Sequence, residues 1–502
     1  IGQIELNDAG VINLGGIGIF EYWGRTGATE TMGSLRLGSS GIFSLSSNVG
    51  AGNVGTLNIT NGIDRSNNRA QLVVTTDGTG NMTSTVNLGS SHGLGTSPLP
   101  WAADGTKGRF MSVDGSNNLV IVAPTDTNDA STITNSATNY RVASGNATLV
   151  NSTLASGAAA NNLGFYRGGS NAGAAVTLTV TDTLTITSGG ISVGNDGNNT
   201  AVIIQGGTSL STSAAALYVS TGYSGAGGTV AINTPVTGNI DFAKTGNSDF
   251  QFGGSVANSY TGNTYVNGGT MLLAKTAGVA SIAGNAVVRT GGTLVLNASN
   301  QIADSASLSV ENGGYFNANN SSETVANLSG GGMILTGGSG TTTVTGAVTI
   351  GDGGIGTMIN NRVGTSSVFQ MSSGAVFNFE LAGNGTTSDM MAFYNFSSNA
   401  EFVRNNNAIN LTLSGVQTGG SYTVSLFKFY SDNGSTLTSS NITSGFLIGS
   451  LGSGISGTPT LNYNSGGNSI DLTFTVVPEP ATWALLAFSL TTVMVFRRRS
   501  KA

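Results

Sequence analysis

The sequence contains no cysteine, one histidine and seven prolines among 502 residues. Without cysteine the chain can form no disulfide and can carry no thiol nucleophile, which fits an exported protein that avoids stray oxidation. With only one histidine, a structural zinc site is also excluded, because such sites need four cysteine or histidine ligands. We therefore expect no metal and no cofactor.

Charged residues are scarce as well. They make up 8% of the chain, whereas about 25% is usual. The net charge is -6, and no basic stripe exists that could neutralise phosphates. Nucleic acid is therefore excluded as a partner.

Glycine is abundant, with 77 residues, and hydrophobic residues reach 38%. The hydrophobic residues alternate with polar ones over short runs, as in residues 176–180 (VTLTV), and Gly, Asn, Asp or Ser bounds each run. This alternation has the period of a half-buried strand, and the bounding residues favour turns. A disordered glycine- and serine-rich linker is the competing interpretation, but it needs no alternation. The sequence predicts an all-β fold.

A ladder of glycine corners repeats through the middle of the chain, and each corner stands between two short strand-like runs, as in TYVNGGTMLL. The intervals between corners are 23, 22, 18, 22 and 20 residues. A near-constant period of this length is typical of solenoids, in which each unit adds one coil. Chance doublets in a glycine-rich chain are the alternative, but chance would not repeat the hydrophobic flanks. The corner glycines are Gly269, Gly292, Gly314, Gly332, Gly354 and Gly374.

We interpret this repeat as a right-handed parallel β-helix (β-solenoid). Each coil lays its strands over those of the coil below, and glycine occupies corners where φ is positive. Coils stack about 4.8 Å apart. A charge repeated at that spacing would repel its copies, whereas Asn, Thr and Ser can hydrogen-bond to theirs. The scarcity of charge is what such a fold requires.

The chain is expected to have four parts. Residues 1–170 form an irregular β-rich beginning of the solenoid, and residues 171–375 form the regular parallel β-helix. In residues 376–477 the strands lengthen and aromatic residues increase, which predicts a β-rich cap or a small sandwich-like domain. A cap is needed because an open last coil exposes unpaired strand edges. Residues 478–502 form a separate tail.

Residues 259–272 (SYTGNTYVNGGTML) resemble the autotransporter-associated β-strand repeat, whose pattern runs roughly Y-T-G-x-T-x-V-x-x-G-T-L. Met271 stands where leucine is usual. The longer stretch 178–335 resembles the passenger β-helices in which this repeat recurs. The resemblance implies an extracellular or surface-exposed parallel β-helix. It does not imply an autotransporter, which should finish in a membrane barrel of alternating strands, whereas this sequence finishes differently.

The tail resembles the PEP-CTERM sorting signal. It has the tripeptide Pro478, Glu479, Pro480, then an apolar run over 481–496, then a basic end. The resemblance implies recognition by an exosortase, a membrane-embedded cysteine transpeptidase that cuts near the tripeptide, either before Pro478 or within it. The basic residues are Arg497, Arg498, Arg499 and Lys501.

Physical arguments support one transmembrane helix in this tail. A helix over 481–496 is about 24 Å long, slightly short of a hydrocarbon core of about 30 Å, and Trp483 and Phe496 mark its two ends. The basic residues that follow place the C-terminus in the cytoplasm and the body outside the inner membrane. Pro478 and Pro480 keep the preceding stretch extended. An ordinary single-span anchor is the alternative, and the tripeptide favours the sorting signal.

Candidate catalytic residues do not cluster in the sequence. His92 lies beside Ser91, but adjacency in sequence does not make a triad. Residues 195–199 (NDGNN) faintly resemble a calcium loop, yet one acidic residue without a terminal glutamate does not favour calcium. Four acidic residues stand apart in turns, where capping is the expected role. They are Asp182, Asp196, Glu311 and Asp389.

The sequence therefore predicts a non-enzymatic bacterial cell-envelope protein that is exported, transiently anchored in the inner membrane, and then placed at the cell surface or secreted. Its expected role is structural, adhesive or polysaccharide-associated. Its expected partners are an exosortase-type transpeptidase, the inner membrane and extracellular polysaccharide. Two alternatives stay open. One is a polysaccharide lyase or hydrolase whose acidic and basic residues meet in a groove, and the other is an adhesin like an autotransporter passenger.

Overall fold

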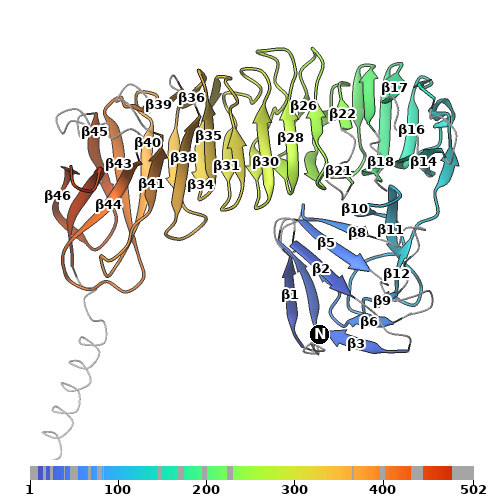
Figure 1. The fold of residues 1–502 in the computed structure, drawn as a ribbon, viewed down its shortest axis with the longest axis horizontal. Helices are drawn as coiled ribbons and strands as arrows, with labels where there is room; N and C mark the ends of the chain where they lie inside the picture. The colour runs from blue at the N-terminus through green and yellow to red at the C-terminus, as the bar shows by residue number, and fades with distance from the viewer. Residues whose placement is uncertain are drawn as a thin grey trace, which may run out of the picture.

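Strands make up nearly all of the described chain in the computed structural model. The described part contains one short 3-10 helix, η1 (Ala130–Thr132). The chain folds into a long stack of coils and a smaller N-terminal stack that lies beneath one end of it (Figure 1). The structure describes residues 9–14, 18–22, 27–38, 40–45, 55–65, 69–75, 82, 84–144, 150–167, 175–194, 201–222, 230–363, 367–395, 402–430 and 445–477.

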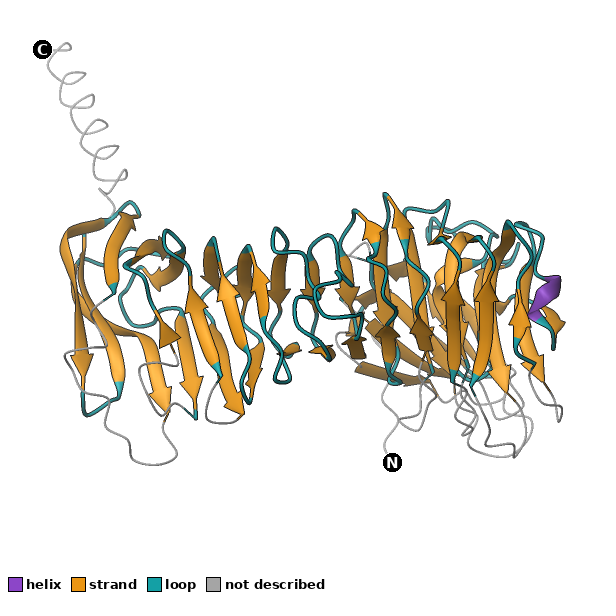
Figure 2. Cartoon of the chain, turned by 90° about the horizontal axis from the view of Figure 1, so that it is seen from above, coloured by secondary structure: helices purple, strands orange, loops and turns teal. Residues whose placement is uncertain are grey.

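The long stack consists of two long sheets whose strands form successive rungs (Figure 2). The chain alternates between the sheets, and the strands pair in parallel with those of the coils before and after them. This all-β connectivity with long parallel sheets is compatible with a parallel β-solenoid. The first long sheet contains, in order, β13 (Thr125–Thr127), β14 (Asn139–Ser144), β16 (Ala158–Arg167), β18 (Thr183–Val193), β21 (Ala216–Thr221), β24 (Asp241–Thr245), β27 (Thr264–Val266), β29 (Ala286–Val288), β31 (Ser307–Val310), β34 (Asn327–Gly330), β37 (Ala347–Ile350), β40 (Val376–Ala382), β43 (Asn407–Ser414) and β45 (Phe446–Leu451), and β20 (Ser209–Ser211) pairs with β18.

The second long sheet faces the first across the interior. Its last two strands are antiparallel to their neighbours, so the parallel pairing ends there. The sheet contains, in order, β15 (Ser152–Thr153), β17 (Val176–Val180), β19 (Val202–Gly206), β22 (Val230–Ile232), β25 (Phe250–Phe252), β28 (Gly269–Leu273), β30 (Gly292–Leu296), β32 (Tyr315–Asn317), β35 (Met333–Gly337), β38 (Thr357–Val363), β41 (Met390–Tyr394), β44 (Gly420–Tyr430), β47 (Ser469–Val476) and β46 (Ile455–Asn464). Short third-side sheets are formed by β23 (Thr237–Gly238) with β26 (Ser259–Tyr260), and by β33 (Glu323–Val325), β36 (Thr341–Val344), β39 (Val368–Met371) and β42 (Phe402–Val403).

The N-terminal stack has three sheets of its own, each built largely from parallel strands of successive coils. Two antiparallel strands, β11 and β12, close one of these sheets. The three sheets are β1 (Val11–Leu14), β4 (Ser34–Leu37) and β7 (Ile63–Asp64); β2 (Gly18–Tyr22), β5 (Ser40–Leu45), β8 (Gln71–Thr75), β10 (Leu99–Asp104), β11 (Arg109–Val113) and β12 (Leu119–Ile121); and β3 (Thr29–Met32), β6 (Thr56–Ile59) and β9 (Thr85–Asn87).

These pairings place the changes of architecture elsewhere than at the expected boundaries. The N-terminal stack ends with β12 and the long sheets begin with β13, so the division falls between residues 121 and 125 rather than at residue 170. At the other end, β40 pairs in parallel with β37, so the stack continues past residue 375. The region expected to be a β-rich cap or a small sandwich-like domain continues the parallel pairing of the long stack, and among the described strands β46 and β47 turn back over its end.

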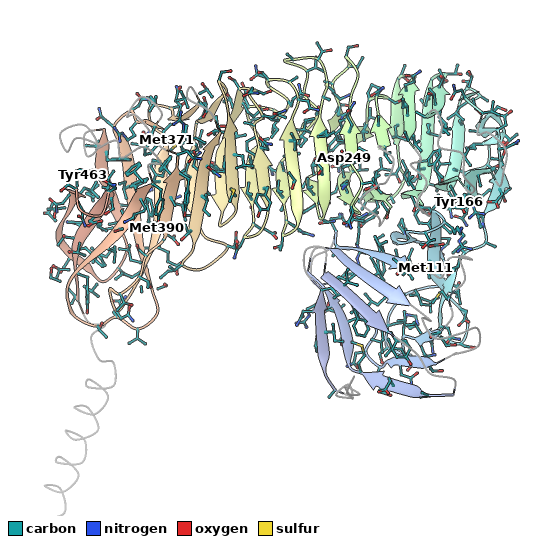
Figure 3. The ribbon with its side chains drawn as sticks, in the orientation of Figure 1. Met111, Tyr166, Asp249, Met371, Met390 and Tyr463 are labelled. Atoms are coloured by element: carbon teal, nitrogen blue, oxygen red, sulfur yellow. The ribbon has the colours of Figure 1, made fainter. Side chains whose placement is uncertain are left out.

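The apolar interior is formed because apolar and polar residues alternate along each strand. In β17, Val176, Leu178 and Val180 are buried and the threonines between them are partly exposed. Met371 lies in the interior of the long stack, and Met111 lies in the core of the N-terminal stack (Figure 3). Each long sheet therefore has one apolar inner face and one outer face, as the period of two requires.

Longer coils explain why the strands lengthen and aromatic residues increase after residue 375. Hydrogen bonds between adjacent coils there join residues 33 apart, as between Thr412 and Phe379, whereas the middle coils join residues 22 apart, as between Asn285 and Asn263. A longer coil encloses a wider interior, and phenylalanine rings fill it. Phe377 and Phe427 pack edge to face with their centroids 5.2 Å apart. The aromatic run thus belongs to the core and not to a second fold.

Four of the six corner glycines form one column. Gly269 pairs with Gly292 in the strand register, and the next pairings align Gly314 and Gly332 above them at the starts of β32 and β35. The following coil departs from the period, because Met333 pairs with Ile359. Gly354 therefore lies in the connection before β38, outside the column. Gly374 lies at another corner, before β40 of the first long sheet.

The expected backbone reason for these glycines applies to two of them. Gly269 has a φ of 63° and Gly374 a φ of 84°. At Gly292, Gly314, Gly332 and Gly354 the expectation of positive φ is wrong. The left-handed position there is a preceding glycine, as at Gly291, where φ is 79°.

Three of the column glycines are required by close approach instead. A Cβ on Gly292 would lie 2.3 Å from the carbonyl oxygen of Val266 in the coil below. A Cβ on Gly314 would lie 2.6 Å from the corresponding oxygen of Val288, and one on Gly332 would lie 2.5 Å from that of Glu311. A side chain here would push adjacent coils apart.

Hydrogen-bonded amides run along the outside of the stack. Asn263 accepts a bond from the side chain of Asn285 at 3.2 Å, and Asn285 in turn accepts from the backbone of Ser307 at 2.9 Å. Asn327 donates to the Ser307 hydroxyl at 3.0 Å and accepts from the backbone of the next coil. A neutral column of this kind replaces the repulsion that stacked charges would produce.

The two stacks are held together by a mixed interface. The Arg65 guanidinium lies 4.3 Å from the Trp101 ring centroid and 5.6 Å from that of Tyr218, so it joins the N-terminal stack to β21. Arg69 pairs with Asp241 of β24 at 2.6 Å. Aromatic contacts and a half-buried ion pair of this type stabilise the joint more than exposed charges would.

We predict that Gly292→Ala lowers the free energy of unfolding by about 1–3 kcal/mol, because its Cβ overlaps rigid backbone. Gly354→Ala is the matched control, since a Cβ there meets nothing within 4 Å and its φ is not positive. It should stay within about 0.5 kcal/mol of the native chain. Urea unfolding followed by far-UV circular dichroism measures both. Equal losses in the two variants would contradict the close-approach argument.

We predict that N263D/N285D is destabilised by about 1–3 kcal/mol at pH 7, because like charges about 5 Å apart repel. This repulsion raises the folded-state carboxyl pKa values above their unfolded values near 4, so the deficit grows as pH rises through that range. N263A/N285A loses the same hydrogen bonds without adding charge. Urea unfolding of both variants at pH 3, at pH 7 and at pH 7 with added salt separates the charge repulsion from the loss of the hydrogen bonds. A deficit that neither acid nor salt reduces would show that charge stacking is not the cause.

Candidate functional site

A polar groove lies where the coils turn at the end of the first long sheet, beside the corner column. It consists of two adjoining hollows of about 520 and 620 Å³ that share Asn312, Gly351 and Asp352. Its lining comes from corners of successive coils, so the stacking itself builds the site. The residues that define the Asp352 groove are Ser309, Glu311, Asn312, Ser329, Gly351 and Asp352.

Asp352 holds the walls of the groove together. Its carboxylate accepts hydrogen bonds from the backbone N–H of Asn312 at 2.7 Å and of Gly331 at 3.0 Å. These amides belong to two lower corners, so one side chain ties three coils. Its position in GDGG, within the connection that departs from the glycine period, allows it to reach back across them.

Glu311 is the second carboxylate of the groove. It was expected to stand alone in a turn, but its Oε1 lies 3.7 Å from Nε of Arg289. Burial raises the pKa of Glu311, the Arg289 charge opposes this, and the nearby Asp352 charge adds to it. The sequence does not show this pairing, because the three residues belong to different coils.

Arg289 connects the groove to the joint between the stacks. It is 5% exposed, its Nη1 donates to Asn267 at 3.0 Å, and its guanidinium lies 4.7 Å from the Tyr265 ring centroid. Asn267 donates to the Gln71 side chain of the N-terminal stack at 3.1 Å. A continuous polar network therefore runs from the N-terminal stack to the groove.

The chemistry of the groove is that of a hydrogen-bonding surface. Hydroxyl, amide and carboxylate oxygens line an open hollow, and both carboxylates are engaged with backbone, since Glu311 also accepts a bond from Thr290. Within the described ranges, no group of three or more histidine or acidic side chains is placed to hold a metal ion. Asp352 accepts its bonds from Asn312 and Gly331 and Glu311 accepts its bond from Thr290, so both carboxylates bond backbone N–H groups at the corners.

Of the other candidate residues, His92 and Asp182 lie apart from this groove, whereas Asp389 adjoins it and accepts a hydrogen bond at 2.8 Å from the backbone N–H of Gly356, which lines the second hollow. His92 accepts a bond from the backbone of Leu94 and lies 3.1 Å from the Asn117 side chain, in a loop of the N-terminal stack. Asp182 caps a corner, where hydrogen bonds from Ser156 and from backbone N–H groups lower its pKa to about 2. Asp389 is buried, and burial raises its pKa to about 6.

The remaining predicted sites lie outside the described residues. Asp196 and the NDGNN loop fall outside the described residues, as does the whole tail with Pro478, Glu479 and Pro480, the span ends Trp483 and Phe496, and the basic residues Arg497, Arg498, Arg499 and Lys501. Among the helices of the described part, none has the length and apolar character to span a bilayer. The expected span over 481–496 lies outside that part.

Sequence reasoning also missed a set of ionisable side chains inside the long stack. Lys244 is fully buried, and its ammonium donates to the carbonyls of Gly246 and Gly268, each at 2.8 Å. Burial lowers its pKa to about 7. Glu323 is 1% exposed, accepts backbone bonds from Gln301 and Ile302, and has its pKa raised by burial to about 7. Both are polar residues within otherwise apolar alternation, which was the available signal.

Comparison with known proteins gives no match: no family model, no curated protein and no solved structure corresponds to this chain.

We predict that the stability of the native chain contains a pH-dependent contribution from Lys244. Its folded pKa of about 7 lies below the model value of 10.5, so the folded state binds fewer protons, and stability rises with pH between these values. Lys244→Met should remove this rise. The free energy of unfolding of the native chain, relative to that of the variant, should therefore increase by up to about 3 kcal/mol from pH 7 to pH 9.5.

Urea unfolding at both pH values tests this. Leu273→Met is the control, since it exchanges one buried apolar residue for another and should cost less than about 1.5 kcal/mol at either pH. If the free energies of unfolding of the native chain and K244M differ by the same amount at pH 7 and pH 9.5, the lowered pKa of Lys244 is contradicted.

Proposed function

We propose that this chain is a non-enzymatic scaffold of the bacterial cell envelope, whose body is a right-handed parallel β-solenoid with a structural, adhesive or polysaccharide-associated role. The observation that carries the proposal is the outer surface of the long stack. Neutral hydroxyl and amide columns repeat over successive coils, and the Asp352 groove is open and polar. Such a surface suits repeated weak contacts along an extended partner.

The sorting part of the proposal is supported by the sequence of the tail. The order of tripeptide, apolar run and basic end favours recognition by an exosortase-type transpeptidase in the inner membrane, with the C-terminus in the cytoplasm. Removal of the tail would release the body to the cell surface or the medium. The low net charge and the absence of cysteine are compatible with that destination.

We predict that changing Pro478, Glu479 and Pro480 to alanine prevents removal of the tail, so the full-length chain accumulates in the inner membrane. Immunoblotting of membrane, surface and medium fractions, in a host that has an exosortase, measures this. Val256→Ala is the control, since Val256 is 58% exposed and far from the tail in sequence, and its processing should be unchanged. If the triple variant is trimmed and exported like the native chain, the sorting proposal is wrong.

A further inference from the structure

The outer face of the second long sheet carries exposed tyrosines, whereas the exposed large apolar side chains on the described strands of the first long sheet are Leu447 and Leu451 of β45. From β28 to β44, the residues that point outward include apolar and aromatic side chains, whereas their neighbours in sequence fill the core. We call this face the tyrosine strip. It is defined by Tyr315, Asn317, Leu335, Asn361, Tyr394 and Tyr430.

Three tyrosines of this strip are exposed to solvent. Tyr315 is 39% exposed, Tyr394 37% and Tyr430 38%. Tyr394 and Tyr430 are register partners on adjacent coils, and their rings stack with centroids 4.4 Å apart and planes 13° apart. The stack holds both rings in a fixed orientation, so a ligand meets a preformed aromatic surface.

Amide groups stand beside these rings. Asn361 is the register partner of Tyr394 one coil below, and its side chain accepts a bond from Asn395 at 3.0 Å. Asn317 pairs with Leu335 in the same column of outward residues. The strip therefore offers rings for apolar contact and amides for hydrogen bonding at coil intervals of about 4.8 Å.

The charge of the strip restricts the ligand. Along the outward positions of these strands, all within the described residues, there is no carboxylate, and the one cation is Lys428. Its ammonium donates to the carbonyl of Gly467 and lies 5.9 Å from the Tyr430 ring centroid. A strip without opposing charge gains little from an ionic ligand and suits an uncharged one.

The size of the strip argues against a second copy of the chain as its occupant. Seven strands at about 4.8 Å give a length of about 29 Å. The strands range from three residues in β32 to eleven in β44, and their mean of about six residues gives a mean width of about 20 Å. The area is then about 580 Å², below the roughly 800 Å² that each partner buries in a standard stable interface. An extended peptide fits no better, because the backbone groups of these strands are paired with neighbouring coils.

We propose that the tyrosine strip binds a neutral polysaccharide chain that lies along the axis of the stack. The C–H faces of sugar rings would pack on Tyr315, Tyr394 and Tyr430, and their hydroxyl groups would bond to Asn317 and Asn361. This inference rests on the proposed scaffold function and names the face and the ligand class that it uses. It is independent of the tail.

Affinity electrophoresis of the full chain tests this, in gels that contain one soluble polysaccharide each: a neutral β-glucan, a neutral mannan, or the polyanion alginate. We expect at least one neutral polymer to retard the native chain and alginate not to. Y394A/Y430A should weaken the apparent affinity at least about tenfold, as loss of a central aromatic anchor does. Y394F/Y430F keeps the rings and should retain binding.

Two further variants distinguish loss of binding from loss of folding. Tyr315→Ala lies on a different coil and should weaken binding by itself, and Leu447→Ala, 57% exposed on the first long sheet, should have no effect. Circular dichroism and sedimentation velocity check folding and association. The proposal is overturned if no neutral polymer retards the native chain, if only alginate does, or if retardation survives Y394A/Y430A. A dimer that these variants abolish would assign the strip to self-association. Normal tail processing in the same variants would leave the scaffold proposal standing.

Discussion

The structure depends on parallel backbone hydrogen bonding between coils about 4.8 Å apart. At that distance each residue lies directly over its counterpart, so every position must tolerate a near copy of its own environment. Gly292 is needed because the carbonyl of Val266 is already where a Cβ would be. Asn263 and Asn285 are favourable because the side chain of Asn285 donates a hydrogen bond to that of Asn263. The same constraint accounts for the low content of charge, since a repeated charge would meet its like on both sides.

The ionisable groups that remain have special places. Arg65 and Arg69 lie at the joint between the stacks, against aromatic rings and a carboxylate, where a flat cation can serve both. Lys244 and Glu323 lie within the long stack and are surrounded by backbone groups of adjacent corners. Asp352 and Glu311 lie at the groove. Each of these charged side chains contacts backbone groups or a side chain of another element, and none of them has a like charge at the same position in the next coil.

Much of the solenoid could be predicted from local patterns. The alternation in residues 176–180 gives β17 its inner face, and the interval of 23 residues aligns Gly269 with Gly292. The sequence does not separate the N-terminal stack from the long one, because residues 1–121 contain a single glycine doublet, Gly15-Gly16, and no repeated series of doublets. Gly354 does not belong to the glycine column as the period predicts, because the connection before β38 has a different length. From the sequence alone, this connection looks like one more repeat.

The groove and the joint were beyond sequence reasoning for a physical reason. Glu311 and Asp352 belong to corners two coils apart, and Arg289 reaches Glu311 from a third coil. Their distances depend on the length of every intervening coil, which local alternation does not specify. The acidic residues beside glycine in SVENGG and GDGG were visible signals, but only stacking could show that they share a surface. The contact of Arg69 with Asp241 is more distant still in sequence.

The most direct test of the account is the register of the coils. Thr270 pairs with Thr293 across adjacent coils, at a spacing of about 4.8 Å that a disulfide can bridge, since its Cα atoms lie about 4.4–6.8 Å apart. The native chain has no cysteine, so any disulfide in a double-cysteine variant is the introduced one. The account predicts that T270C/T293C oxidises readily and that T270C/V295C, two residues out of register, does not. Equal oxidation of the two pairs, or oxidation of the offset pair alone, would contradict it.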